Sequence, residues 1–204
     1  MRTAVTQRAA FTGAMLRRRL GAGVYRLDMN EIAVTAVGAD RPGIVAALTQ
    51  ALLDLGGNLE DCRAALLRGS FAIALLVTVP DEVTAGDVDA TLRPVADELG
   101  LGLWTGPAPP DLDPHGARER CMVSVYGVDR PGIVHAITEA IAAADANILD
   151  LSSRAAGTPA IYVLGIEVEL PAQMTTHALE SRLRPVAASH QVELAVVPVA
   201  DEVL

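Results

Sequence analysis

Apolar and polar residues alternate over residues 31–37, with Ile32, Val34 and Ala36 on one face, and this period of two predicts a β-strand. From Pro42 onward the period becomes that of an amphipathic helix, which Gly56-Gly57 ends. The apolar positions of this helix are Ile44, Val45, Leu48, Leu52 and Leu55. The pattern therefore begins with a strand followed by a helix that buries one face.

The same kind of pattern predicts two further strands over 58–67 and 70–80, joined by a turn at 68–70. A second helix is expected over 82–100 and a short last strand over 101–105. The order strand–helix–strand–strand–helix–strand is the split βαββαβ unit of ferredoxin-like folds, which is an α+β architecture.

This unit occurs twice, because the octapeptide GADRPGIV at 38–45 returns as GVDRPGIV at 127–134, 89 residues later. The same spacing joins Asp40 to Asp129, Gly43 to Gly132, Thr49 to Thr138, Asn58 to Asn147, and Asp61 to Asp150. Further on, LRPVA at 92–96 and 183–187, and Pro80 and Pro171, are 91 residues apart. One insertion of two residues between Asp150 and Pro171 reconciles the spacings, so we expect two tandem ferredoxin-like domains.

The domain limits follow from composition. Residues 106–120 form the expected linker, since 105–120 holds four prolines and two glycines without a periodic apolar face. The first domain is then 30–105 and the second 121–204. Residues 1–29 are rich in arginine and lack the apolar core of a secretory signal. We expect them to be a disordered N-terminal extension, although they loosely resemble a transit peptide.

Two features of this pattern lead to further expectations about the structure. Strand 71–79 is apolar on both faces, and the helices of a ferredoxin-like unit cover only one face of its sheet. We therefore expect the other face, or an edge, to meet a partner. Pro94 and Pro185 fall inside the second helix of each unit, where we expect a kink unless the helix boundaries lie a few residues away.

Net charge, hydropathy and cysteine content limit the classes of function that we expect of the chain. The net charge is −9, of which residues 1–28 carry +5 and the rest −14, and an acidic body argues against direct binding to nucleic acid. The chain has no uncharged apolar run of 18 residues, so no membrane-spanning helix is expected. Cys62 and Cys121 have no CxxC neighbour, which argues against a disulfide framework or zinc site and fits the reducing cytoplasm.

No catalytic machinery is evident from the sequence. The four histidines, at 115, 135, 177 and 190, lack metal-ligand spacing, and no hydrolase, metalloprotease or P-loop motif occurs. We expect a protein that is not an enzyme and that uses no metal or cofactor. An unrecognised small enzyme is the least favoured of the alternatives.

The repeated loop allows two interpretations. Pro42 suits the first helical position, Arg41 is pushed to an extended conformation, and Asp40 lies beside the helix N-terminus. Gly38 would allow a tight turn, and Gly43 a close approach to the backbone. The loop is thus either a helix cap and turn alone, or an anion site at a helix N-terminus. In the second case we expect Asn58 to reach the same ligand, because its strand is taken to lie beside the first.

The segments GADRPGIV…GGNLED and GVDRPGIV…DANILD resemble the signature of ACT domains, small modules that sense amino acids, over roughly residues 30–204. A pair of such domains with nothing else is most similar to the glycine cleavage system transcriptional repressor group. The resemblance implies ligand binding at domain or subunit interfaces and regulation through a protein partner, without a DNA-binding domain. The residues that match the family's ligand positions are Gly38, Asp40, Arg41, Pro42, Gly43, Asn58, Gly127, Asp129, Arg130, Pro131, Gly132 and Asn147.

The copies differ where Ala46 of the first is matched by His135 of the second. This histidine is either a plain surface residue or a sign that the second pocket has another polarity, and we include it among the candidate ligand residues. The expected function is a regulatory protein that binds a small amino acid such as glycine, acts through a protein partner and forms a homo-oligomer. The alternative is a structural interaction module with vestigial pockets.

Overall fold

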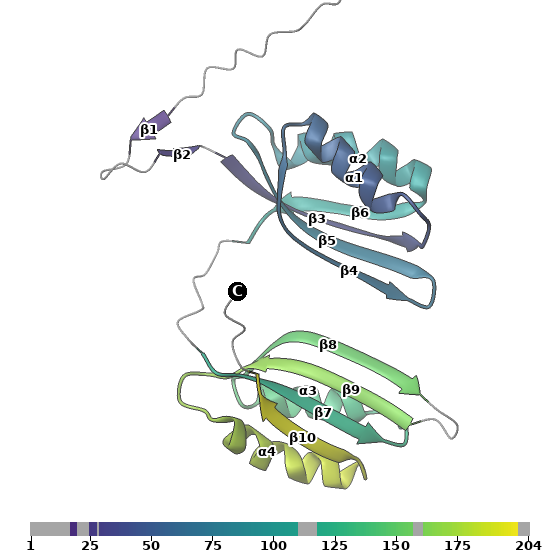
Figure 1. Ribbon diagram of the computed structural model, residues 1–204, viewed down its shortest axis with the longest axis vertical. Coiled ribbons are helices and arrows are strands. Elements are labelled where there is room, and N and C mark those ends of the chain that lie inside the picture. Colours follow the sequence, from purple (N-terminus) through teal and green to yellow (C-terminus); the bar gives the residue numbers. More distant parts are fainter. Residues whose placement is uncertain (1–16, 20–24, 28, 110–117, 157–160, 200–204) are drawn as a thin grey trace, which may run out of the picture. The chain divides into compact units, whose positions relative to one another are not determined.

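The computed structural model describes residues 17–19, 25–27, 29–109, 118–156 and 161–199. The chain divides into two compact units, Met1–Asp111 and Leu112–Leu204. Each unit holds a four-stranded antiparallel sheet with two helices on one of its faces (Figure 1). Before the four-stranded sheet of the first unit, β1 (Arg17–Arg19) and β2 (Tyr25–Leu27) pair antiparallel. Most of the segment 1–29 lies outside the described residues, so its disorder stays a prediction.

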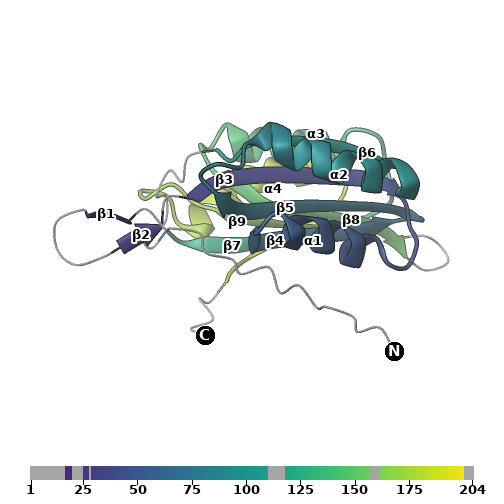
Figure 2. The ribbon, with the colours of Figure 1, turned by 90° about the horizontal axis from the view of Figure 1, so that it is seen from above.

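Unit 1 has the expected βαββαβ order. Its elements are β3 (Met29–Ala39), α1 (Ile44–Asp54), β4 (Asn58–Leu67), β5 (Ser70–Pro80), α2 (Ala85–Leu99) and β6 (Leu101–Pro107). The sheet order is β4-β5-β3-β6, so β5 separates β3 from β4. Seen from above, α1 lies on the β4 side of the sheet and α2 on the β6 side (Figure 2).

Turn and cap residues set these boundaries. β4 and β5 match their predicted ranges because Arg68 and Gly69, with φ of 49° and 86°, form the tight turn between them. α2 begins three residues later than expected because Thr84 and Asp87 cap it reciprocally, with the Thr84 N–H donating to Asp87 Oδ2 at 2.8 Å. Pro94 and Pro185 do lie inside helices, as expected.

The core of unit 1 lies between the sheet and its two helices. Strand β5 contributes Ile73, Leu75, Val77 and Val79 to it, all buried. The opposite face of the sheet, here called the open face, carries mostly small or apolar residues. Among them, Val37 and Trp104 are 50% and 56% exposed. The two apolar faces of strand 71–79 are therefore present, while the partner expected on the open face stays a prediction.

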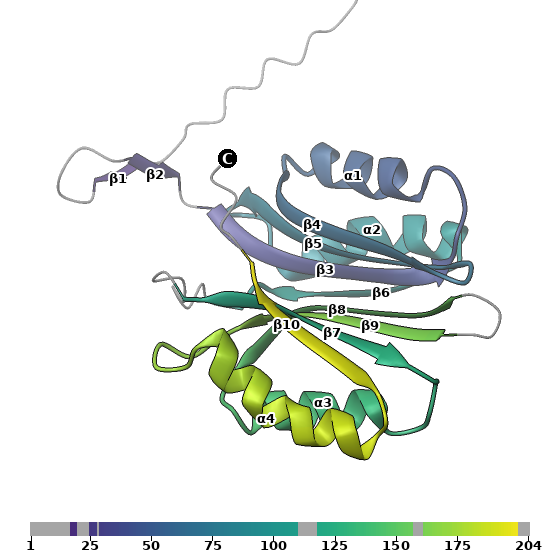
Figure 3. The ribbon, with the colours of Figure 1, turned by 60° about the horizontal axis from the view of Figure 1, so that its bottom comes forward.

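Unit 2 repeats this topology (Figure 3). Its elements are β7 (Arg120–Gly127), α3 (Ile133–Ala142), β8 (Asn147–Ala156), β9 (Ile161–Glu169), α4 (Thr176–Ser189) and β10 (Glu193–Pro198), with the sheet order β10-β7-β9-β8. β8 follows β4 by 89 residues and β9 follows β5 by 91, so the two inserted residues fall between Ala156 and Ile161. The insertion therefore lies between β8 and β9 along the chain.

Candidate ligand-binding site

The repeated loop ends in a helix N-terminus that no side chain caps. α1 starts at Ile44 and α3 at Ile133, and in both the N-cap residue is a glycine, Gly43 or Gly132, at φ 94°. The expected start at Pro42 is two residues too early, and Asp40 is not the cap. Because the first-turn N–H groups of a helix have no intrahelical acceptor, they remain available to an anion.

The space over these two glycines is open. A β-carbon on Gly43 would meet no atom within 4 Å, and one on Gly132 would meet only Cε1 of His190, at 3.7 Å. A positive φ also disfavours any residue with a β-carbon. Glycine at this position therefore both makes the turn and leaves the N-terminus approachable, while the close approach expected at Gly43 stays a prediction.

Gly38 and Gly127 have another role than the expected tight turn. Both lie in strands, and Gly38 pairs with Phe71 on one side and Leu101 on the other. A β-carbon would come within 2.7 Å of the Gly100 carbonyl oxygen at Gly38, and within 2.7 Å of Val192 Cγ1 at Gly127. These glycines let the strand pack closely against the segment that follows the second helix, so they help to fix the position of the strand from which the loop begins.

The charged residues of the repeated loop differ in their hydrogen bonding. Arg41 Nη2 donates to the carbonyl oxygen of Glu98 at 2.7 Å, and Arg130 donates to Gln191 Oε1, so both arginines tie the loop to the end of the second helix. The carboxylates of Asp40 and Asp129 are exposed and make no hydrogen bond or ion pair within the described part of the chain. The aspartates are therefore the charged groups that a ligand can reach.

Asn58 lies at the wrong end of the unit to share a ligand with residues 38–43. Gly38 pairs with Phe71, whereas Asn58 pairs with Thr78, seven residues along β5. At about 3.3 Å per residue this is roughly 23 Å. The expectation failed because β3 and β4 are not neighbours: β5 lies between them and both point toward the same end (Figure 1). The same holds in unit 2, where Gly127 pairs with Tyr162 and Asn147 with Glu169.

The two asparagines also differ from each other. Asn58 Nδ2 donates to Glu60 Oε1 at 2.9 Å, and Thr78 Oγ1 donates to the same oxygen at 2.8 Å. These two bonds, that of Thr78 first, lower the pKa of Glu60. In unit 2 the Glu60 position is Leu149, and the Asn147 side chain has no hydrogen bond within the described residues. Asn147 is therefore the asparagine whose amide remains available.

Two histidines flank the loop of unit 2. His135, in the first turn of α3, is 80% exposed, and its Nε2 lies 3.8 Å from Glu139 Oε2. His190 was not expected at the site. It is the half-buried C-cap residue of α4, and it borders Gly132. Its counterpart in unit 1 is Leu99, so comparing the copies could have flagged it, but spacing alone gives no reason to place it beside the loop.

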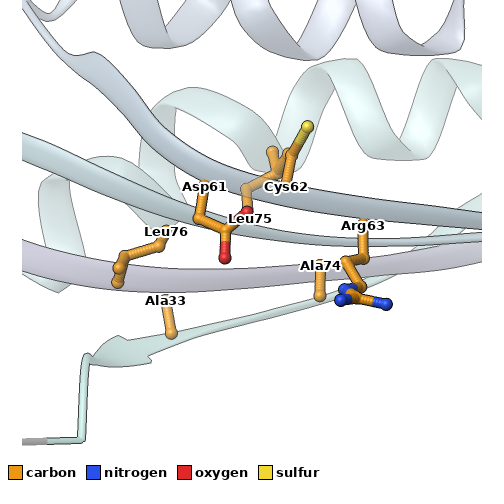
Figure 4. A pocket seen from close by; sticks show the side chains of 7 residues that line it. All are labelled: Ala33, Asp61, Cys62, Arg63, Ala74, Leu75 and Leu76. Atoms are coloured by element: carbon orange, nitrogen blue, oxygen red, sulfur yellow. The ribbon is translucent and has the colours of Figure 1, made fainter. Parts of the chain in front are cut away.

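A separate hollow of about 180 Å³ lies on the open face of unit 1 (Figure 4). It is lined by Ala33, Asp61, Cys62, Arg63, Ala74, Leu75 and Leu76. The Cys62 sulfur points to the opposite side of the sheet from Asp61 and Arg63 (Figure 4). The hollow is a shallow part of the apolar open face, and none of the loop residues lines it.

Other kinds of site are not supported in the part of the chain that the structure describes. No three His, Cys, Asp or Glu side chains of that part come together as metal ligands would. None of its helices has the length and apolar character needed to span a membrane.

The ACT domain model matches residues 30–104 and 119–197. The chain belongs to the ACT domain family. The two matches coincide with the two βαββαβ units of this ACT chain.

The relatives of this ACT chain carry different names and differ in how much of their length it matches. UPF0237 protein MK1213 of Methanopyrus kandleri is 38% identical over 76 residues, which are 37% of this chain and 84% of the relative. The glycine cleavage system transcriptional repressor of Escherichia coli is 31% identical over 129 residues, or 60% of this chain and 64% of the relative. A phosphoserine phosphatase of Streptomyces coelicolor is 31% identical over 177 residues, or 83% of this chain but 40% of the enzyme.

One solved structure, of an unknown protein from Galdieria sulphuraria, matches with a TM-score of 0.74 and 25% identity. The match covers 85% of this chain and all of that one. Both ACT units thus have a counterpart of known structure.

Proposed function

We propose that this chain is a non-catalytic regulatory protein that binds a small amino acid, with glycine as the first candidate, at the loops of its ACT units. The observation that carries the proposal is the uncapped N-terminus of α1 and of α3, each beside an aspartate, Asp40 or Asp129, whose carboxylate has no partner among the described residues. The first-turn N–H groups suit a carboxylate, and the aspartate suits an ammonium group. An α-amino acid carries both groups at a short separation.

The candidate residues then divide by role. Asp40 and Asp129 contact the ligand, and Gly43 and Gly132 leave room for it. His135 adds a polar group to the second site only. The remaining loop residues hold the loop in place: Gly38, Arg41, Pro42, Gly127, Arg130 and Pro131.

A neighbouring copy of the chain supplies the second polar wall of the first site. β4 is an edge strand whose ten residues are all exposed. If two copies pair antiparallel along β4 about Cys62, each Asp61 lies opposite the other copy's Arg63, which is a favourable cross-strand pair. The irregularity of β4 between Leu59 and Asp61 shifts the register before Asn58, but this pairing still brings the Asn58 end of one copy's β4 beside the Leu66 end of the other, and the row of Leu66 runs through Phe71 to Gly38. A homo-oligomer paired in this way therefore brings Asn58 of one copy to the loop end of the other, an end that Asn58 does not reach within its own unit.

The output of this sensor is a contact with another protein. The acidic composition disfavours nucleic acid as a direct partner, and the Escherichia coli relative is named as a transcriptional repressor. The exposed Val37 and Trp104 of the open face also support the alternative, an interaction module with vestigial pockets.

Calorimetry with glycine and L-serine separates these two functions. The decisive variant is Ala46→Asp, which places a carboxylate in the exposed first turn of α1, with Ala46→Asn as its uncharged control. The new acid should stabilise the helix by about 0.3–1 kcal/mol, because it interacts favourably with the helix dipole, yet it should repel the carboxylate of an amino acid bound at the helix N-terminus. His135→Asp tests the second loop in the same way. If no amino acid binds the native protein at millimolar concentration, the loops are structural turns and the interaction module is the better description.

A further inference from the structure

A second hollow, of about 430 Å³, lies in unit 2 at the end of the sheet remote from residues 128–132. It is lined by Ala144, Asp145, Pro171, Ala172, Gln173, Met174 and Arg182. Two loops and one helix form it: the loop from α3 to β8, the loop from β9 to α4, and α4 itself. Its volume falls in the range of small-molecule sites. We call it the distal cup.

The polar side chains that line the distal cup have no hydrogen-bond or ion-pair partner among the described residues. The side chains of Asp145, Gln173 and Arg182 form no hydrogen bond or ion pair within the described part of the chain. By contrast Arg184, two residues along the same helix, binds Glu180 at 2.7 Å. An aspartate, an amide and a guanidinium thus face one hollow without partners of their own.

Unit 1 is built differently at the equivalent place. There Asn30 Nδ2 donates to the carbonyl oxygens of Asp81 and Val83, both at 3.0 Å, and so fixes the loop before α2. In unit 2 the matching residue is Glu119, whose carboxylate accepts from the Thr176 N–H at 3.2 Å. A carboxylate cannot donate to carbonyls, so it leaves those of Ala172 and Met174 without the donor that unit 1 provides.

The charges of the two places differ as well. The counterparts of Ala172, Gln173 and Arg182 in unit 1 are Asp81, Glu82 and Thr91. Unit 1 therefore presents two carboxylates and no cation at these positions, whereas the distal cup presents one cation, one carboxylate and an amide. The cup is a property of the second copy and not of the shared fold.

We propose that the distal cup binds a zwitterionic amino acid with an apolar side chain, at a site separate from the repeated loops. The guanidinium of Arg182 suits a carboxylate, which it can bind with two parallel hydrogen bonds. Asp145 and the loop carbonyls suit an ammonium group. Pro171 and Met174 provide apolar surface for a side chain, and a ligand without one, such as glycine, leaves that surface uncovered.

The test is an NMR titration of the full ¹⁵N-labelled chain with L-methionine, with the amides of residues 144, 145 and 172–174 as the readout. We expect saturable shifts there, and Arg182→Gln and Asp145→Asn should each weaken the affinity about tenfold, as expected for lost hydrogen bonds to charged groups. Asparagine tolerates the positive φ of 53° at position 145, so the loop should keep its shape. Arg184→Gln, on the same helix, should leave the affinity unchanged.

Partial ligands test the zwitterion itself. Methionine methyl ester lacks the carboxylate and 4-(methylthio)butanoate lacks the ammonium, so each should bind the cup much more weakly than methionine. The proposal is overturned if either analogue or glycine shifts the cup amides as strongly, if methionine gives no saturable shift there, or if Arg182→Gln binds like the native protein. Glycine binding at the loops is read separately at residues 43–46 and 132–135, so one result does not decide the other.

Discussion

Arg41 reaches from the loop before α1 to the far end of α2, where its Nη2 donates to the carbonyl oxygen of Glu98 at 2.7 Å. A cation at a helix C-terminus satisfies a free carbonyl and the helix dipole. We expect Arg41→Ala to lower the stability of unit 1 by about 1 kcal/mol. The chain has one tryptophan, Trp104 in β6, so its fluorescence follows the unfolding of unit 1. Arg130→Ala, in the other unit, should leave that transition unchanged.

Gly43→Ala tests the left-handed start of α1. With φ at 94°, a β-carbon costs about 1–2 kcal/mol, although the space around it is empty. Gly86→Ala is the matched control, because Gly86 lies within α2 at an ordinary φ and its added β-carbon would meet only Thr84 Oγ1 at 3.5 Å. That change should stabilise the unit by about 0.5–1 kcal/mol. Denaturant midpoints followed by Trp104 should therefore move in opposite directions.

Acid should weaken unit 1 through the cap of α2. Hydrogen bonds from the Thr84 side chain, and then its backbone, hold the pKa of Asp87 below its ordinary value of 3.8. A carboxyl whose pKa is lowered by folding contributes stability above its unfolded pKa and loses it as pH falls through the folded pKa. Midpoints measured between neutral pH and pH values below 3.8 should fall, and less steeply in Thr84→Val. The control is Thr175→Val in unit 2, where the Thr175 hydroxyl accepts from the Ala178 N–H, and it should not alter the Trp104 transition.

The two thiols should react very differently. Cys62 is exposed on β4, while Cys121 is buried, and burial together with the charge of Glu119 raises the pKa of Cys121 to about 11. Because the thiolate is the reactive form, iodoacetamide at mildly alkaline pH should add one group to the native protein and two after denaturation. Mass spectrometry of native Cys62→Ser should show none. Rapid double modification of the folded chain would contradict the burial of Cys121.

Pairing along β4 predicts a specific cross-link. In the antiparallel register about Cys62, the two Cys62 residues face each other at about 4.5–5.5 Å between their α-carbons, which is within disulfide range. Mild oxidation should therefore give a covalent dimer on a non-reducing gel, and Cys62→Ser should abolish it. Arg63→Glu should also reduce it by placing like charges opposite Asp61, and Arg154→Glu in unit 2 controls for the change in net charge. A monomer in sedimentation would contradict the homo-oligomer.

Most of the fold could be read from the sequence because its boundaries are local. Gly56-Gly57 and the Arg68-Gly69 turn fix β4 and β5 to the residue, and the repeat then fixes β8. The late start of α2 was also readable, since Thr84 and Asp87 are spaced as a capping pair. These signals need only residues that are close along the chain.

The site was only partly predictable, because strand order is not a local property. Alternation shows which residues share a face, but not that β3 and β4 both pair with β5 and so run parallel, which places the start of β4 and Asn58 at the opposite end from the loop. The arginine bonds to Glu98 and Gln191, and the approach of His190 to Gly132, likewise join residues more than fifty positions apart. Only the folded sheet brings such residues to one end.

The two extra residues of unit 2 fall between Ala156 and Ile161, at the place where unit 1 has the Arg68-Gly69 turn, and the pairs of β8 with β9 keep the pattern of β4 with β5, including its one irregularity. In unit 1 the same turn touches the loop, where the Asp40 N–H donates to the Gly69 carbonyl oxygen at 2.8 Å. For protein engineering, this turn is a place where length can be changed without shifting the strand register. A randomised peptide inserted there would be displayed beside the loop, so new binding specificities could be selected on an unaltered scaffold.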